Sequence, residues 1–293
     1  MSSLPDYCRE ITQNRQNGAS QLYDQFLSKF AEYVNENKGR IPSLMSNLPQ
    51  EIVAVRPDMA PFYHAAKAVN AEITRWKEER AADLATIFPK LLSSLMTERA
   101  EAVGRVVAFA RSLLPAKGVI MLHSRTSTVR DVMTQALDRG TQVFISESRP
   151  GEEGRLFAEE LHSRGFRVTL FPDDAKLALL PRADFVLLGT DWLSEHDFTN
   201  KIGSHSLAVG AGEFGIPIYV VTDHTKMVPS HLRQPRQSTS QEMSNGVSWE
   251  APLFEETLSD LVTSFITDLG LLKPLDVRLQ IETTWRDTQI ESE

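Results

Sequence analysis

From residue 118 onward, short apolar runs alternate with helical stretches or compact loops. Each run is rich in Val, Ile, Leu or Phe and is too short for a core helix, so each is expected to form a strand. Strands that alternate with helices are typical of βαβ units with right-handed crossovers. The chain is therefore predicted to be α/β, with a parallel sheet in its second part. The runs are GVIMLHS, QVFISES, RVTLFPD, DFVLLGTD and IPIYVVTD.

A polar residue closes each of these runs. In open α/β sheets, ligands bind at the carboxyl ends of the strands, because the loops that follow the strands gather at one edge. Exposure of the strand ends to solvent would explain a polar residue in some of the runs, but not in all of them. We therefore expect a binding site at this edge, among the following positions: Ser124, Glu147, Ser148, Asp173, Asp191 and Asp223.

The first 116 residues carry the periodicity of helices and no convincing strand. Apolar residues recur at three- and four-residue spacing within 18–36, 58–76 and 79–113, with charged faces between them. Pro115 and Gly118 are expected to end the last of these helices. The sequence thus predicts a helical domain over 1–116 and a sheet domain over 117–293.

The segment after Asp223 has little periodicity and is basic within an acidic protein. A loop of this length is uncommon and is either functional or mobile. Two interpretations stay open, a solvated surface excursion or a lid that binds an anion. A final helix is expected at about 255–269, followed by a polar tail. The basic residues of the segment are His224, Lys226, His231, Arg233 and Arg236.

Composition excludes several classes of function. With 39 acidic and 31 basic residues the formal net charge is −8, which argues against nonspecific binding of nucleic acid or of an anionic membrane. Cys8 is the only cysteine, so neither a disulfide framework nor a Cys-based zinc site is expected. The amino terminus lacks an apolar signal segment, and no stretch approaches the roughly 18 apolar residues of a membrane span. We expect a cytoplasmic protein without a metal site.

Gly210, Gly212 and Gly215 match the G-x-G-x-x-G pattern of dinucleotide-binding loops. Those glycines act by following a strand and opening a helix. Here the order is reversed, since 206–214 is predicted to be helical and the run IPIYVV comes after it. Gly215 is better explained as a helix C-cap, and no nicotinamide or other cofactor is expected.

Three segments carry a resemblance to a known family. The first, SESRPGEEGRLFAEEL (146–161), resembles the Glu-Ser/Thr-Arg-Pro segment of the translation initiation factor 2B α/β/δ subunit family. The second, NKIGSHSLAVGAGEFGIPIYVV (200–221), resembles the Asn-Lys-Ile-Gly-Thr helix of this family, and the third, FVLLGTDWL, resembles its Gly-Ala-Asp strand. This family includes methylthioribose-1-phosphate and ribose-1,5-bisphosphate isomerases. Residues 254–274 are similar to its C-terminal segment. The resemblance implies a helical N-terminal domain, a Rossmann-like C-terminal domain, and homodimers or larger assemblies.

One departure from the family pattern bears on catalysis. The isomerases have a Cys after the His that ends the first strand, paired with an Asp that ends the Gly-Ala-Asp strand. The corresponding residues here are Ser124, after His123, and Asp191. A thiol with a pKa near about 8.5 can be tuned for proton transfer, whereas a serine hydroxyl needs an adjacent base. His123 is expected to order its neighbours by hydrogen bonds.

These observations favour a protein that binds a phosphorylated sugar or nucleotide at the carboxyl edge of its sheet and acts through binding and assembly. The alternative is an aldose–ketose isomerase for a phosphorylated pentose such as ribose 1,5-bisphosphate. In that case Asp191 would be the acid–base residue, and Ser124 or an ordered water would replace the thiol. Asp191 could instead cap a helix or order a loop. A third function, guanine-nucleotide exchange on a translation factor, follows only from the family name.

The candidate ligand-binding residues follow from charge and position. Lys201, after Asn200 at the expected start of a helix, could bring its ammonium and free N–H groups to one phosphate. Arg149 offers a planar fork for a second phosphate or a carboxylate, or else pairs at the surface with Glu152 or Glu153.

The strand-to-helix turn at 124–128 presents hydroxyls, with Arg125 and Ser127 among its candidates; they suit phosphate oxygens and equally suit N-capping. The segment NRQNGAS (14–20) is weakly similar to the family's Gly-Ala turn, which adds Gly18 and Ala19 as candidates. Alternatively, these two residues only begin a helix.

Overall fold

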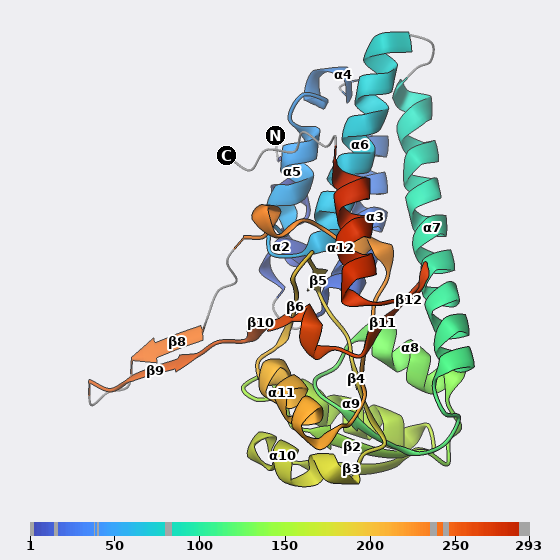
Figure 1. Cartoon of the computed structure of the whole chain (residues 1–293). Helices are drawn as coiled ribbons and strands as arrows, with labels where there is room; N and C mark the ends of the chain where they lie inside the picture. Colours follow the sequence, from blue (N-terminus) through green and yellow to red (C-terminus); the bar gives the residue numbers. More distant parts are fainter. Residues whose placement is uncertain are drawn as a thin grey trace.

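The computed structural model describes residues 3–14, 17–37, 39, 41–79, 84–234, 239–242 and 246–286. Within these ranges the chain is helical up to residue 113 and contains no strand before residue 119. The three long helices expected from periodicity are present as α3, α6 and α7 (Figure 1). The helices are α1 (Leu4–Tyr7), α2 (Arg9–Gln13), α3 (Ala19–Glu36), α4 (Ile41–Leu44), α5 (Leu48–Val55), α6 (Ala60–Glu79) and α7 (Leu84–Leu113).

Aromatic side chains form the core of the helical region. Phe26 and Phe30 of α3 and Phe62 of α6 are fully buried, and the rings of Phe26 and Phe62 lie 4.9 Å apart. Large buried rings at i and i+4 of one helix place its apolar face against a neighbouring helix. No helix in the described part of the chain is long and apolar enough to cross a membrane.

A mostly parallel sheet follows, in the order β12-β11-β7-β4-β1-β2-β3, and only β12 is antiparallel to its neighbour. Counted along the chain, the parallel strands of the described residues lie in the order 3-2-1-4-5-6, so the order reverses between β1 and β4. Such a reversal opens a crevice at the carboxyl edge. The strands are β1 (Val119–Leu122), β2 (Gln142–Ser146), β3 (Arg167–Phe171), β4 (Phe185–Leu188), β7 (Ile218–Val221), β11 (Ser264–Thr267) and β12 (Gly270–Leu272).

Short helices connect these strands. They are α8 (Ser127–Ala136), α9 (Glu153–Ser163), α10 (Lys176–Leu179) and α11 (Ser204–Phe214), with 3₁₀ turns η2 (Asp173–Ala175), η3 (Leu180–Arg182), η4 (His224–Lys226), η5 (Ser230–Leu232) and η6 (Ser259–Leu261). Helix α11 ends at Gly215, whose φ of 66° is the left-handed conformation of a glycine C-cap, as predicted. Because α11 precedes β7, the three glycines do not form a dinucleotide loop.

Two smaller antiparallel sheets lie beside the main one. In the first, β6 (Asp197–Lys201) lies between β10 (Phe254–Leu258) and β5 (Trp192–Leu193) and pairs with both. The second is a hairpin of β8 (Thr239–Glu242) and β9 (Ser248–Ala251), which projects from the body in Figure 1. A last helix, α12 (Pro274–Trp285), is drawn in front of the N-terminal helices in Figure 1 and contacts α6 through Lys67, whose ammonium lies 4.7 Å from the ring centroid of Trp285.

The C-terminal part corrects two expectations. The helix expected at 255–269 is wrong, because this segment forms β10, η6 and β11. Its apolar residues fit helical spacing, yet Phe265 and Ile266 are fully buried in a strand that pairs with β7. Helix α12, which the sequence pattern did not predict, begins within GLLKPLDV (270–277) and runs into the polar tail. The expected boundary at residue 116 falls between α7 and β1, and the division into two domains stays a prediction.

Candidate functional site

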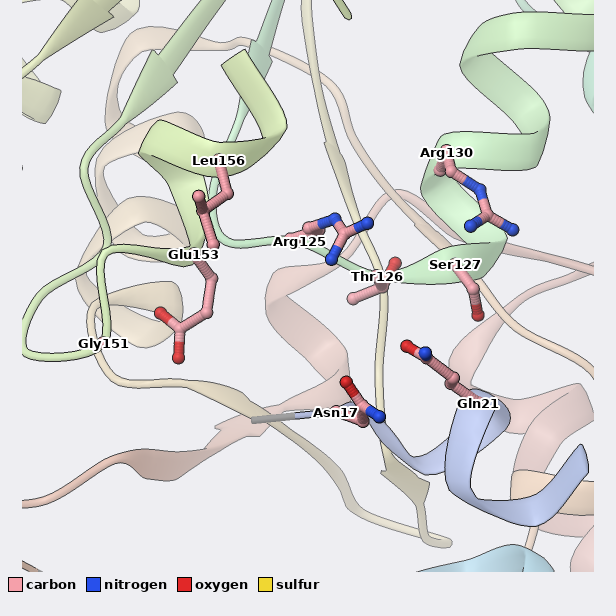
Figure 2. A pocket seen from close by; sticks show the side chains of 10 residues that line it. Asn17, Gln21, Arg125, Thr126, Ser127, Arg130, Gly151, Glu153 and Leu156 are labelled. Carbon is pink, nitrogen blue, oxygen red and sulfur yellow. The ribbon is translucent and has the colours of Figure 1, made fainter. Parts of the chain in front are cut away.

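A cavity of about 320 Å³ lies at the carboxyl edge of the parallel sheet. The amino-terminal ends of three helices converge on it: α3 from the helical region, and α8 and α9 from the sheet (Figure 2). This location, beside the reversal of strand order, is where open α/β sheets bind ligands. The described lining residues are Asn17, Gly18, Gln21, Arg125, Thr126, Ser127, Arg130, Gly151, Glu153 and Leu156.

The first turn of α8 forms one wall of the cavity. Thr126 is its N-cap, and its side chain accepts a hydrogen bond from the backbone N–H of Val129 at 3.2 Å. A Cβ at Gly189, just after β4, would lie 2.4 Å from Oγ1 of Thr126, so only glycine allows this close approach. The N–H groups and hydroxyls of this turn are donors suited to an anion.

Left-handed backbone conformations gather at the same edge. Ser124, Ser148 and Glu152 have φ values of 66°, 63° and 57°, and they are the non-glycine residues with positive φ among those described. Such conformations cost about 1–3 kcal/mol each and persist where the surroundings impose them. The Ser124 N–H donates to Oγ of Ser148 at 2.8 Å, which joins the ends of β1 and β2.

Asp173, after β3, holds the loop that follows β2. Its carboxylate accepts the backbone N–H groups of Ser148 at 3.0 Å and Arg149 at 2.7 Å. Partial burial raises the pKa of Asp173, but these hydrogen bonds and one from Ser146 outweigh burial, and its pKa is lowered. Asp173 therefore acts as an ionised anchor of the loop.

His123 orders its neighbours, as the sequence suggested. Its Nδ1 lies 2.7 Å from Oγ of Ser146, and its Nε2 lies 2.7 Å from the carbonyl oxygen of Ile202. Burial and the nearby Lys176 lower the pKa of His123 to about 3, so the ring is neutral. Both nitrogens are engaged away from Ser124, so His123 is not placed to activate that hydroxyl.

Asp191 connects the sheet to the helical region. Its Oδ1 accepts the backbone N–H of Ala19 at 3.2 Å, and a Cβ on Gly18 would lie 3.8 Å from the same oxygen. Asp191 is buried, whereas Gly18 lines the cavity. The structure thus brings Gly18, Ala19 and Asp191 together, although 172 residues separate Ala19 from Asp191.

Asn200 and Lys201 differ from their expected setting. They lie on β6 and pair with β10, and α11 begins only at Ser204. Lys201 is 2% exposed, and its Nζ lies 3.0 and 2.9 Å from the two carboxylate oxygens of Glu153. The Asn200 amide donates to Oγ of Ser204 at 2.9 Å. The prediction that both residues stand at the start of a helix is therefore wrong, because pairing with β10 holds the chain there in an extended strand.

The two arginine candidates lie differently. Arg149 is an exposed side chain that pairs with Glu147 at 3.1 Å and Glu152 at 2.9 Å, and it is not among the described lining residues. Arg149 thus forms a surface ion pair with Glu152, one of the two pairings that its sequence position predicted. Arg125 lines the cavity and pairs with Glu160 at 3.1 Å. Ser127 lines the cavity at the first position of α8.

The basic residues after β7 do not gather as a lid. Lys226 is buried and donates to the carbonyl oxygen of Thr190 at 2.8 Å, and the fork of Arg233 holds Asp197. His224 lies between Asp268 at 2.7 Å and Glu98 at 3.0 Å. These three cations are thus paired within the protein, whereas His231 is exposed and Arg236 lies outside the described residues. No cluster able to hold a metal ion occurs in the part of the chain that the structure describes.

Sequence reasoning missed several lining residues. Gln21 lies in the first turn of α3, and no pattern in the sequence connects it to the sheet. Asn17 lies in the segment 14–20, of which only Gly18 and Ala19 were candidates. Arg130 could have been predicted from the sequence, because it follows Ser127 by three residues and so lies on the same helix face. Glu153 lies within the segment 146–161, but its sequence position suggested only a partner for Arg149.

Comparison with known proteins identifies the family. The sequence profile of the Initiation factor 2 subunit family matches residues 16–274. The chain therefore belongs to this family, which confirms the resemblance seen in the sequence.

Individual relatives include enzymes and an initiation factor. A methylthioribose-1-phosphate isomerase of Desulforudis audaxviator is 33% identical over 208 residues, or 62% of this chain and 60% of that protein, which is less than two thirds of its length. A ribose 1,5-bisphosphate isomerase of Archaeoglobus fulgidus is 25% identical, over 85% of this chain and 82% of that protein. The solved structure of translation initiation factor eIF-2B from Pyrococcus horikoshii OT3 matches with a TM-score of 0.78 at 23% identity. The match covers 94% of this chain and 98% of that chain, which shows the shared fold.

Proposed function

We propose that this protein binds a phosphorylated sugar or nucleotide in the cavity at the carboxyl edge of its sheet, and that it acts by binding and assembly. The observation that carries the proposal is the convergence of the α8 amino terminus, Arg125 and Arg130 on one polar cavity. A helix amino terminus with hydroxyls and guanidinium groups is a phosphate-binding arrangement.

The isomerase alternative is favoured by one observation. Asp191 lies against Gly18, which lines the cavity, and the resemblance of FVLLGTDWL to the family's Gly-Ala-Asp strand gives Asp191 the place of the isomerases' aspartate. An aldose–ketose isomerase needs a base to remove a proton from one sugar carbon and return it to the next. The neutral, fully engaged His123 argues against this alternative, because Ser124 then lacks a histidine base to activate it.

Ligand binding is tested by thermal shift and calorimetry with ribose 5-phosphate and ribose. We expect ribose 5-phosphate to raise the melting temperature and to bind at micromolar to millimolar strength, because a ligand that binds only the native state stabilises it. Ribose is expected to bind far more weakly. Equal affinities for the two compounds would contradict the proposal.

Assembly gives a second test. Leu271 of β12, and Leu275 and Leu279 on one face of α12, are each 42–61% exposed. Exposed leucines so close together are unusual on a monomer surface and support a homodimer contact. We expect at least a dimer by sedimentation at micromolar concentration, and we expect Leu275→Glu with Leu279→Glu to weaken it. A single 32.9 kDa species for the wild type would refute the dimer.

A further inference from the structure

The cavity has two chemically different ends. Figure 2 shows Arg130 and Ser127 at one side, Glu153 at the other, and Arg125 between them. The α8 end offers donors, namely hydroxyls, guanidinium groups and the free N–H groups of the helix. The Glu153 end offers carboxylate oxygens, which accept hydrogen bonds and repel anions.

Lys201 partly offsets the charge of Glu153 but offers no free ammonium to a ligand at the second end. Its ammonium lies behind Glu153, within 3.0 Å of both carboxylate oxygens, and Lys201 is 2% exposed. The Glu153 side chain is 25% exposed and lines the cavity. A ligand that enters the cavity therefore meets the carboxylate of Glu153 before it can reach Lys201.

The position of Glu153 is fixed by the backbone. It is the first residue of α9, and a Cβ at the next residue, Gly154, would lie 1.8 Å from the carbonyl oxygen of Ser146. This contact holds the start of α9, and with it the backbone of Glu153, against the end of β2, and the ion pair with Lys201 holds the carboxylate. The carboxylate is thus a built part of the cavity wall.

From this geometry we infer that Glu153 is a specificity-determining residue, and that the cavity selects a ligand with one phosphate and one hydroxyl-bearing end. The phosphate lies at the start of α8, and the sugar hydroxyls donate to Glu153. A second phosphate at that end is disfavoured by the carboxylate. This inference rests on the proposed function and goes beyond it, because it separates monophosphates from bisphosphates.

The test compares ribose 5-phosphate with ribose 1,5-bisphosphate by calorimetry. We expect the wild type to bind the monophosphate at least as tightly as the bisphosphate. Glu153→Gln keeps the size of the side chain, removes its charge and frees the ammonium of Lys201. This variant is expected to bind the bisphosphate at least about tenfold more tightly, because a close unit charge in a partly buried site is worth more than that factor. Its affinity for the monophosphate should change by less than about threefold, since a neutral amide still accepts a hydroxyl hydrogen bond.

The neighbouring Glu152 provides a matched control. Its carboxylate pairs with Arg149 at 2.9 Å and Arg155 at 3.4 Å on the surface, and it is not among the described lining residues. Glu152→Gln is expected to leave both affinities unchanged.

The possible results distinguish a failure of the assignment of Glu153 from a failure of phosphate binding in the cavity. A wild type that binds the bisphosphate tenfold more tightly than the monophosphate overturns the assignment of Glu153, and this measurement needs no variant. An unchanged ratio in folded Glu153→Gln overturns it as well. In both cases phosphate binding itself stands. Equal binding of ribose and ribose 5-phosphate instead removes the proposed function, and the inference with it.

Discussion

Replacing Arg99 by Met is expected to lower the free energy of unfolding by about 3–5 kcal/mol at pH 7. Arg99 of α7 is 5% exposed, and its guanidinium lies 3.0 Å from the carboxylate of Asp223, which is fully buried after β7. Removal of the guanidinium leaves a buried carboxylate without its main partner. Urea unfolding of the two proteins measures the difference.

The pH dependence of this loss follows from the pKa of Asp223. Burial raises that pKa, but Arg99 and Lys226 outweigh burial and lower it from 3.8 to about 2. A carboxyl group with a depressed folded pKa stabilises the protein above its unfolded pKa, and this contribution is lost as the pH falls through the folded pKa. The difference between wild type and Arg99→Met should therefore narrow between pH 4 and pH 2. A difference that stays constant with pH would indicate lost packing instead of lost charge.

Asp24 serves as the control for the same arginine. Its carboxylate lies 3.4 Å from Nε of Arg99, but its side chain is 57% exposed. Exposed ion pairs contribute little, so Asp24→Asn is expected to cost less than about 1 kcal/mol. Equal losses in the two variants would contradict the assignment of the stabilisation to the buried pair.

The strands of the main sheet were predictable where their signal was local. The runs that became β1, β2, β3, β4 and β7 are each apolar and end in polar residues, and this pattern needs no knowledge of neighbours. Strand β11 was not predictable in this way, because the spacing of Val262, Phe265 and Ile266 also fits a helix. Pairing with β7 and β12 decides its structure, and that pairing is a property of the tertiary fold.

The part of the candidate site that the order of the strands positions was predictable from the sequence. Parallel strands end at one edge, so Ser124 and Asp191 could be assigned there from the sequence. The contact of Ala19 with Asp191 and the pairing of Lys201 with Glu153 join residues 172 and 48 positions apart. These contacts depend on how the helical region and α9 pack against the sheet. Charge and strand position alone did not reveal that Glu153 covers Lys201.

Ser124→Cys is expected to raise aldose–ketose isomerisation roughly 100- to 10,000-fold above a wild type that turns over slowly or not at all. The cysteine restores a proton-transfer group at the end of β1, where the neutral His123 cannot activate a serine hydroxyl. Product formation from methylthioribose 1-phosphate and ribose 1,5-bisphosphate measures the gain. Both sugars are needed, because Glu153 is expected to disfavour the second phosphate.

Asp191→Asn in the Ser124→Cys background is the decisive control. Asparagine keeps the size of the side chain and an oxygen that can accept the N–H of Ala19, but it cannot take a proton from a sugar carbon. The gain should therefore disappear while phosphate affinity stays nearly intact. A wild type that turns over at about 1–1,000 per second would favour the isomerase function over the binding function. If Ser124→Cys binds ligand but stays inert, the site has diverged by more than one residue, and Asp191 is not a latent base.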